Sequence, residues 1–304
     1  MLAGFFVKGG EEKMGLVTDS ISDWLKELFS ELITMMIKSI FEYITTMFGD
    51  ASTIISATPS SYNSTIFDMI QQINENVVLP IAGILMTYVV CYELITMLLE
   101  KNNMVEIDVF MIFKWFMKTF ITIELVTNAF TIIMALFDVG AELVADATGV
   151  TGEIIELQAT EITADVSSMS LPQVLATTAS VGILAAVLYV AKIWITLIIA
   201  LRFFNIYIQS SVASLPFATW GNHQLNNMGM NYLKNMLGLA FQGMFMIITI
   251  SIYVVLVTDC VANLSSGGIA EFQENIPTML IWTILLMVTL KGTDTLAKSI
   301  FDSH

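Results

Sequence analysis

The chain has 304 residues, of which 56% are hydrophobic and 13% are charged, against roughly 25% charged residues in an average soluble domain. This composition excludes an ordinary water-soluble fold. Lysine and arginine number 12 and aspartate and glutamate 27, so the net charge is −15. Such acidity disfavours a chain whose main task is to grip nucleic acid or anionic lipid.

The first predicted element is an amphipathic helix over residues 23–48. Its polar positions recur every three or four residues and form one stripe, made of Glu27, Glu31, Thr34, Lys38, Glu42 and Thr45. Apolar residues fill the opposite side, namely Leu25, Leu28, Leu32, Met36, Ile40, Tyr43 and Met47. This pattern is typical of a helix that lies in a membrane interface or against a partner. We expect it to end at Phe48-Gly49-Asp50.

A turn near Pro59 and a short helix over 63–76 are expected to lead into five apolar segments. About 20 apolar residues in a helix cross a hydrocarbon core of roughly 30 Å. The segments are 77–99, 112–137, 177–200, 236–258 and 276–290. We expect Pro277 in the first turn of the last helix, where proline needs no amide partner. The third helix is expected to continue past Arg202 to about Ile208.

The fold class predicted from these elements is all-α. We expect a polytopic helical membrane protein with five transmembrane helices plus an N-terminal amphipathic helix. Its predicted division is an extracytoplasmic segment 1–76, a five-helix transmembrane domain 77–290 and a cytoplasmic tail 291–304.

Lysine and arginine in the short connections predict the orientation. The loops 138–172 and 259–275 contain no basic residue and should face outside. The cytoplasmic side is expected to hold the basic residues Lys101, Lys114, Lys118, Arg202, Lys234, Lys291 and Lys298. Five spans then place the N-terminus outside and the C-terminus in the cytoplasm of a protein of the cell membrane.

Three ionisable residues fall inside the predicted spans, namely Glu93, Glu124 and Lys192. Each costs roughly 2.5 to 3.5 kcal/mol at a helix centre unless it is paired or hydrated. All three lie at nearly one depth, so we predict an intramembrane charge cluster with Lys192 between two carboxylates. A structural role in fixing helix register, or snorkelling to the interface, is favoured over a polar lining of a water-filled passage or a proton relay.

Small residues recur with helical spacing at the start of the third segment, at Thr178, Gly182 and Ala186. They allow another helix to approach closely, either within the chain or between copies.

After the third segment, residues 213–222 are apolar but broken by proline and glycine. The pattern predicts a cytoplasmic elbow at the membrane surface, where a partner could dock. We predict that this contact is made by Arg202, Pro216, Phe217, Trp220 and Asn222.

Signatures of an enzyme are missing from the sequence. Lys291-Gly292-Thr293 has neither the order nor the upstream glycine of a phosphate-binding loop. His223 and His304 are far from each other in the sequence and from the cysteines, which favours ordinary polar residues over metal ligands. We therefore expect no enzyme activity, no cofactor and no metal site.

Three stretches resemble a known family. They are Val78-Leu79-Pro80-Ile81-Ala82-Gly83 with Tyr92-Glu93-Leu94-Ile95-Thr96 and Lys101-Asn102-Asn103; Pro216-Phe217-Ala218-Thr219 with Gly221-Asn222, Asn231-Tyr232 and Phe241-Gln242-Gly243; and Lys298-Ser299-Ile300-Phe301. From about Trp24 to the C-terminus the chain resembles the TrbL-like polytopic channel subunits of type IV secretion and conjugative transfer machines, in the short form found in Gram-positive mobile elements.

The resemblance implies a membrane scaffold or channel subunit without catalytic activity. Such a subunit forms rings and helps to move single-stranded DNA with its bound relaxase across the cell membrane. The implied partners are further copies of the chain, the ATPases and the coupling protein of the machine, bitopic channel subunits and membrane lipid, with translocated DNA as a transient contact. A small-solute transporter is the alternative, but it would show a duplicated half or paired broken helices, and neither is visible.

Overall fold

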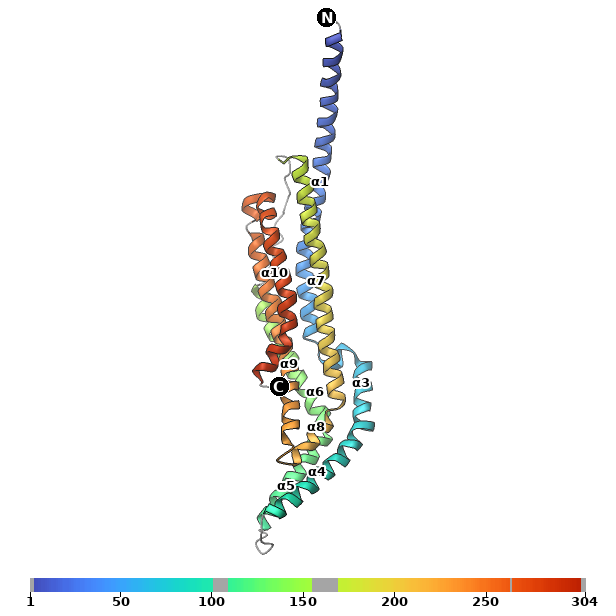
Figure 1. Cartoon of the computed structure of the whole chain (residues 1–304), viewed down its shortest axis with the longest axis vertical. Coiled ribbons are helices and arrows are strands. Elements are labelled where there is room, and N and C mark those ends of the chain that lie inside the picture. Colours follow the sequence, from blue (N-terminus) through green and yellow to red (C-terminus); the bar gives the residue numbers. More distant parts are fainter. Residues whose placement is uncertain (1–2, 101–108, 155–168, 263, 302–304) are drawn as a thin grey trace. The chain divides into compact units, whose positions relative to one another are not determined.

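The computed structural model describes residues 3–100, 109–154, 169–262 and 264–301. Every regular element in these ranges is helical (Figure 1), which confirms the predicted all-α class. The elements are α1 (Ala3–Ile55), α2 (Pro59–Tyr62), α3 (Ser64–Ile73), a π-helical turn (Asn74–Val78), α4 (Leu79–Glu100), α5 (Val109–Thr127), α6 (Ala129–Ile154), α7 (Leu171–Ser211), α8 (Ser214–Ala218), a 3-10 turn (Thr219–Gly221), α9 (Asn226–Ala262) and α10 (Leu264–Ile300).

Within the described ranges, four stretches are long and apolar enough to cross a membrane, namely Ser64–Leu99, Leu171–Ser211, Asn226–Cys260 and Phe272–Ile300. Helices α5 and α6 together form a fifth candidate, but they are bent by 65°. The predicted span over 112–137 falls on this bent pair. At the break, the side-chain amide of Asn128 donates to the carbonyl oxygen of Glu124 at 3.0 Å, and such local bonds compete with regular helical geometry.

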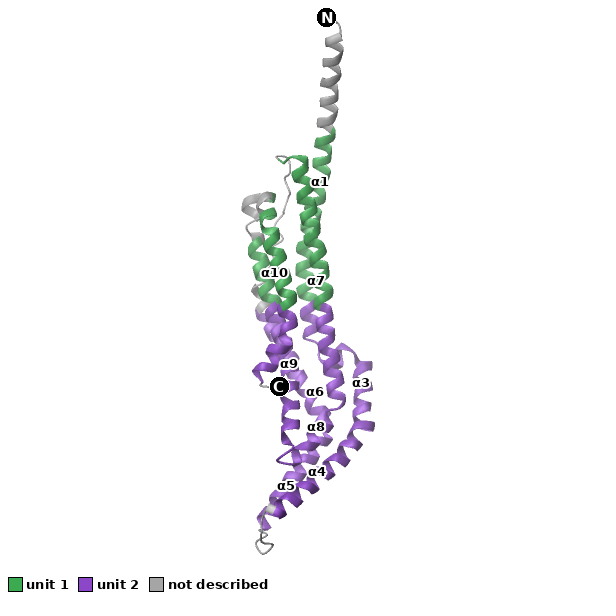
Figure 2. Cartoon of the chain, viewed as in Figure 1, with its two compact units in different colours: residues 1–50, 153–195, 250–288 green, residues 51–152, 196–249, 289–304 purple. Residues whose placement is uncertain are grey.

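The described part of the chain forms two compact units (Figure 2). Unit 1 comprises residues 1–50, 153–195 and 250–288, and unit 2 comprises residues 51–152, 196–249 and 289–304. Each unit thus collects segments that are far apart in the sequence.

Unit 1 packs α1 and α10 with the beginning of α7 and the end of α9. Among its fully buried side chains are Ile33, Ile37, Leu184, Ile250 and Phe272. Polar bonds also join its helices: Thr177 Oγ1 lies 2.9 Å from Gln273 Oε1, and Trp194 Nε1 donates to the carbonyl oxygen of Met287 at 3.1 Å. Each bond satisfies a polar group that would be costly to bury alone.

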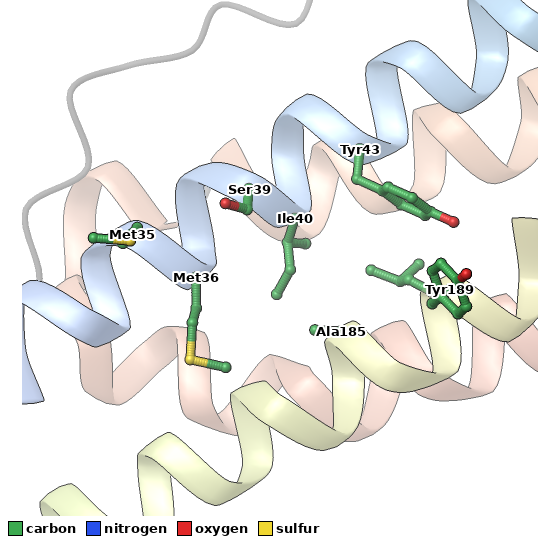
Figure 3. A pocket seen from close by; sticks show the side chains of 8 residues that line it. Met35, Met36, Ser39, Ile40, Tyr43, Ala185 and Tyr189 are labelled. Atoms are coloured by element: carbon green, nitrogen blue, oxygen red, sulfur yellow. The ribbon is translucent and has the colours of Figure 1, made fainter.

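Within unit 1, α1 runs parallel to α7. A Cβ atom at Gly182 would lie 3.6 Å from Cε of Met36, and Lys192 Nζ lies 3.0 Å from Asp50 Oδ2. A pocket of about 260 Å³ follows this seam, and Figure 3 shows the side chains of Tyr43 and Tyr189 next to each other at one end. Its lining residues are Met35, Met36, Ser39, Ile40, Tyr43, Ala185, Leu188 and Tyr189.

Unit 2 is built around α4 and α5, which contact each other and α8. The rings of Tyr62 and Phe203 are stacked with centroids 3.9 Å apart, and Tyr207 donates to the carbonyl oxygen of Pro59 at 2.7 Å. Asn74, in the π-helical turn, donates to the carbonyl oxygen of Ser211 at 3.0 Å. These contacts hold the segment that leads into α4 against the end of α7.

Several predicted boundaries are wrong, all because helices continue beyond the apolar stretches. Helix α1 does not end at Asp50 but reaches Ile55. Pro277 is inside α10 rather than in its first turn. The predicted loop 259–275 is largely helical, and α6 occupies the predicted loop 138–172 as far as residue 154. By contrast, the predicted continuation of the third helix past Arg202 is confirmed, since α7 ends at Ser211.

The buried face of α1 agrees in part with the predicted one, since Ile40 and Met47 are buried and Met36 and Tyr43 are half-buried. Ile33, Ile37 and Ile44 are buried, whereas Leu28 and Leu32 are exposed. The predicted polar stripe is better placed, because its members between residues 27 and 45 are exposed, apart from the half-buried Thr34. The predicted apolar side is therefore wrong at the two leucines, while Ile33, Ile37 and Ile44 join the predicted residues on the buried side.

Candidate functional site

Glu93 on α4 connects three segments of unit 2. Its side chain is buried, and Oε1 accepts a hydrogen bond from Lys118 Nζ on α5 at 2.7 Å. Oε2 accepts from the backbone N–H of His223 at 3.2 Å. Nearby, Trp115 Nε1 donates to the carbonyl oxygen of Val90 at 3.3 Å and adds a second link between α5 and α4. One carboxylate thus fixes α4, α5 and the segment after the elbow.

A pocket of about 690 Å³ opens beside this ion pair. Its lining residues are Glu93, Thr96, Met97, Phe110, Met111, Lys114, Trp115, Lys118, His223 and Gln224. The two lysines supply donors, and Glu93 is already occupied by Lys118 and His223. Among the residues with described positions, no group of three histidine, cysteine, aspartate or glutamate side chains could hold a metal ion. The arrangement anchors α4, α5 and the segment after the elbow to one another.

The predicted elbow is a packed connection. Phe217 and Asn222 are buried, and α8 with the 3-10 turn contacts α4 and α5. Asn222 Oδ1 accepts from the backbone N–H groups of Gln224 and Leu225 at 2.8 and 3.1 Å, which is the capping role that asparagine fills before a helix. The chain's own helices therefore cover much of the elbow.

Trp220 and Pro216 are half-buried, and their placement depends on a glycine of α9. A Cβ atom at Gly229 would lie 2.3 Å from Cδ1 and Nε1 of Trp220 and 2.7 Å from the carbonyl oxygen of Pro216. Any side chain at this position would displace the indole ring. The absence of a side chain at Gly229 is thus what allows α9 to approach the elbow.

Arg202 is buried in unit 2 and binds backbone carbonyl groups. Its Nε donates to Leu239 at 3.2 Å, Nη1 to Ile55 at 3.3 Å and Nη2 to Ala240 at 3.4 Å. Ile55 is the last residue of α1, so the guanidinium group lies where a helix end presents unpaired carbonyls and partial negative charge. Arg202 joins α7, α9 and the end of α1, and its contact with a partner stays a prediction.

The three residues of the predicted charge cluster have these contacts. Glu93 pairs with Lys118, Glu124 Oε2 accepts from Asn128 Nδ2 at 3.3 Å, and Lys192 pairs with Asp50. Lys192 Nζ also lies 5.3 Å from the ring centroid of Tyr43. The grouping of Glu93, Glu124 and Lys192 stays a prediction.

The small residues of α7 have different surroundings. Gly182 is opposite Met36 of α1, Thr178 donates to the carbonyl oxygen of Val174 at 2.9 Å, and Ala186 is exposed. Gly182 therefore serves packing within the chain, while Ala186 is available to lipid or to another protein.

Sequence reasoning missed Asp50 and Gly229. Asp50 lies 142 residues before Lys192, and nothing in the local pattern signals so distant an ion pair. Gly229 follows Met228 near the start of α9, where a glycine in a helical pattern is a weak hint of close approach.

A family model described as TrbL/VirB6 plasmid conjugal transfer like protein matches residues 44–214, which is more than half of the chain. The match takes in the end of α1, the α4–α6 region, α7 and the beginning of α8. A search of curated proteins and a search of solved structures each found no match.

Proposed function

The chain belongs to the family of TrbL/VirB6 plasmid conjugal transfer-like proteins, and we propose that it is an integral membrane scaffold or channel subunit of a conjugative type IV secretion system. In this role it assists the transfer of single-stranded DNA with bound relaxase across the cell membrane. The observation that carries the proposal is the family match over residues 44–214. The family is one of membrane transfer proteins and is not known as enzymes.

We propose that the main partners of the chain are proteins rather than nucleic acid. A net charge of −15 opposes strong contact with DNA, which is itself densely anionic. The protein would therefore assemble with further copies of itself, with the ATPases and coupling protein of the machine and with membrane lipid, while DNA makes at most a transient contact. The exposed residues His223 and Gln224 beside the elbow are the part of that region we propose for partner contact.

We propose an orientation with the N-terminus outside and the C-terminus in the cytoplasm. The distribution of lysine and arginine among the connections supports it. Its test is the accessibility of single cysteines at Ser170 and Asn226, which are both exposed. An impermeant thiol reagent added to intact cells should label Ser170→Cys and spare Asn226→Cys, and the reverse result would contradict the orientation.

The function is tested by deleting the gene from its mobile element and measuring plasmid transfer and solute uptake. We expect transfer to be lost while uptake is unchanged. The full chain supplied in trans should restore transfer, and a Glu93→Gln chain that is present in the membrane at lower stability should restore it in part. Loss of solute uptake with normal transfer would instead support a transporter.

A further inference from the structure

The surface of unit 1 is divided by chemistry between its helices. From 177 to 195 the exposed residues of α7 are Ala179, Ile183, Ala186, Tyr189, Val190 and Ile193, and from 276 to 288 those of α10 are Pro277, Ile281, Ile284, Leu285 and Val288. On α9, Ile252 and Val255 are exposed. These faces have the composition expected of a surface in contact with lipid chains.

The exposed side of helix α1, in contrast, is mainly polar. Apart from Met35, its exposed residues between 35 and 50 are Lys38, Ser39, Glu42, Thr45, Thr46, Gly49 and Asp50. We call these seven residues the polar face of α1. Its buried side is apolar, with Ile37, Ile40 and Ile44 in the core of unit 1.

The polar face lies at the level of a membrane span. Met36 is beside Gly182 and Asp50 is beside Lys192, so α1 follows α7 through the middle of its apolar stretch. From residue 36 to residue 50 the helix rises about 21 Å, at about 1.5 Å per residue. Helix α1 therefore carries polar side chains on one side over most of the thickness of a hydrocarbon core.

Ionised side chains at that depth are unstable against lipid and persist where they are hydrated or paired. Lys192, the one basic residue of α7 between 171 and 195, reaches across to Asp50 on α1 rather than toward the apolar faces. Lys38 and Lys192 also balance Glu42 and Asp50 in charge. Water, with opposite charges close by, is the environment that suits this face.

We propose that the polar face of α1 lines a water-filled passage enclosed by several copies of this chain. One copy has a single such face and cannot surround a passage. Copies arranged about an axis with α1 innermost would bring the polar faces together and leave the apolar faces of α7 and α10 to lipid. The inference rests on the proposed function, because a scaffold or channel subunit is expected to assemble with itself.

The test compares cysteines at the same level on two helices of the full-length protein, purified and reconstituted in lipid vesicles. Cys91 and Cys260 are first replaced by alanine. Thr46→Cys places a thiol on the polar face, and Ile193→Cys places one on the exposed face of α7. A charged methanethiosulfonate is supplied on both sides of the membrane, and N-ethylmaleimide confirms that each thiol is present.

We expect Thr46→Cys to react at least about tenfold faster than Ile193→Cys, because the charged reagent needs a hydrated thiolate. Ser39→Cys and Ile183→Cys repeat the comparison nearer the start of the seam and replace the first pair if it misfolds. A bifunctional maleimide should join Thr46→Cys chains into multimers and leave Ile193→Cys chains single.

Other results overturn the proposal. Fast reaction at both positions would mean that this level of unit 1 lies outside lipid, and slow reaction at both would mean that the polar face is covered. Fast reaction at Thr46→Cys without cross-linked multimers would mean that copies do not enclose the water. This experiment does not measure plasmid transfer, so its outcome is separate from that of the gene deletion. If the polar face is hydrated but deletion leaves transfer intact, only the proposed function is refuted.

Discussion

Lys118 Nζ lies 2.7 Å from Glu93 Oε1, and this ion pair joins α5 to α4 beside the backbone of His223. The side chain of Glu93 is 11% exposed and that of Lys118 is 36% exposed. The carboxylate therefore has little access to water and depends on its two protein donors.

Replacing Glu93 by glutamine should lower the free energy of unfolding by about 1–2 kcal/mol, because the charge-assisted bond to Lys118 is lost. Unfolding of the purified protein in a detergent titration, followed by tryptophan fluorescence, measures the change. Glu124→Gln is the matched control and should change stability by less than about 0.5 kcal/mol, since Glu124 is exposed. Additive effects of Glu93→Gln and Lys118→Met would argue against the pair.

Replacing Arg202 by lysine should lower the free energy of unfolding. Its guanidinium group reaches the carbonyls of Ile55, Leu239 and Ala240 while 4% exposed, and one ammonium nitrogen cannot copy that fork. Arg202→Met should cost about 2–4 kcal/mol of unfolding free energy through lost contacts. Arg202→Lys should cost more than Arg202→Met, because it keeps a buried charge with fewer partners. A lysine variant as stable as the parent chain would show that the three contacts do not matter.

Gly229→Ala should destabilise unit 2 by about 1–3 kcal/mol through overpacking against Trp220. The new methyl group would start 2.3 Å from two atoms of the indole ring, so the tryptophan emission should shift as well. Gly292→Ala is the control, since nothing lies within 4 Å of a Cβ atom there. It should leave stability unchanged or raise it by about 0.5–1 kcal/mol through helix propensity. Equal effects of the two alanines would contradict the close approach of α9 to the elbow.

The Lys192–Asp50 pair should be weak. Asp50 has a side chain 59% exposed, and exposed ion pairs contribute about 0.2–1 kcal/mol in double-mutant cycles. A cycle of Lys192→Met and Asp50→Asn, measured by unfolding in detergent, checks this value. A larger coupling of Lys192 to Glu124 in the same assay would support the charge cluster predicted from the sequence.

The apolar segments and the all-α class could be predicted because long hydrophobic runs have few stable structures other than membrane helices. The helix ends could not. Around Pro277 the helix continues on both sides of the proline, and no local signal distinguishes a helix that stops there from one that passes through. The family resemblance was visible in short motifs such as Tyr92-Glu93-Leu94-Ile95-Thr96, and the family match, which covers residues 44–214, confirms it.

The candidate site was harder to predict than the fold. Periodicity indicates the depth of Glu93 but not which helix faces it, so its partner Lys118 could not be chosen among the basic residues. The same limit applies to Arg202. Its acceptors are backbone carbonyl groups, which every residue has, so the sequence does not indicate which ones it binds. Partner identity depends on how helices pack, and a single sequence does not encode that packing in any short pattern.

The break at Asn128 divides the bent candidate span into two helices, α5 and α6. Regular backbone bonds continue on both sides, from Asn128 to Glu124 and from Ile132 to Asn128, so the joint is ordered rather than frayed. On α6, Gly140 is seated against Ala240. Because α6 is fixed there, the 65° bend sets the direction in which α5 leaves it toward α4.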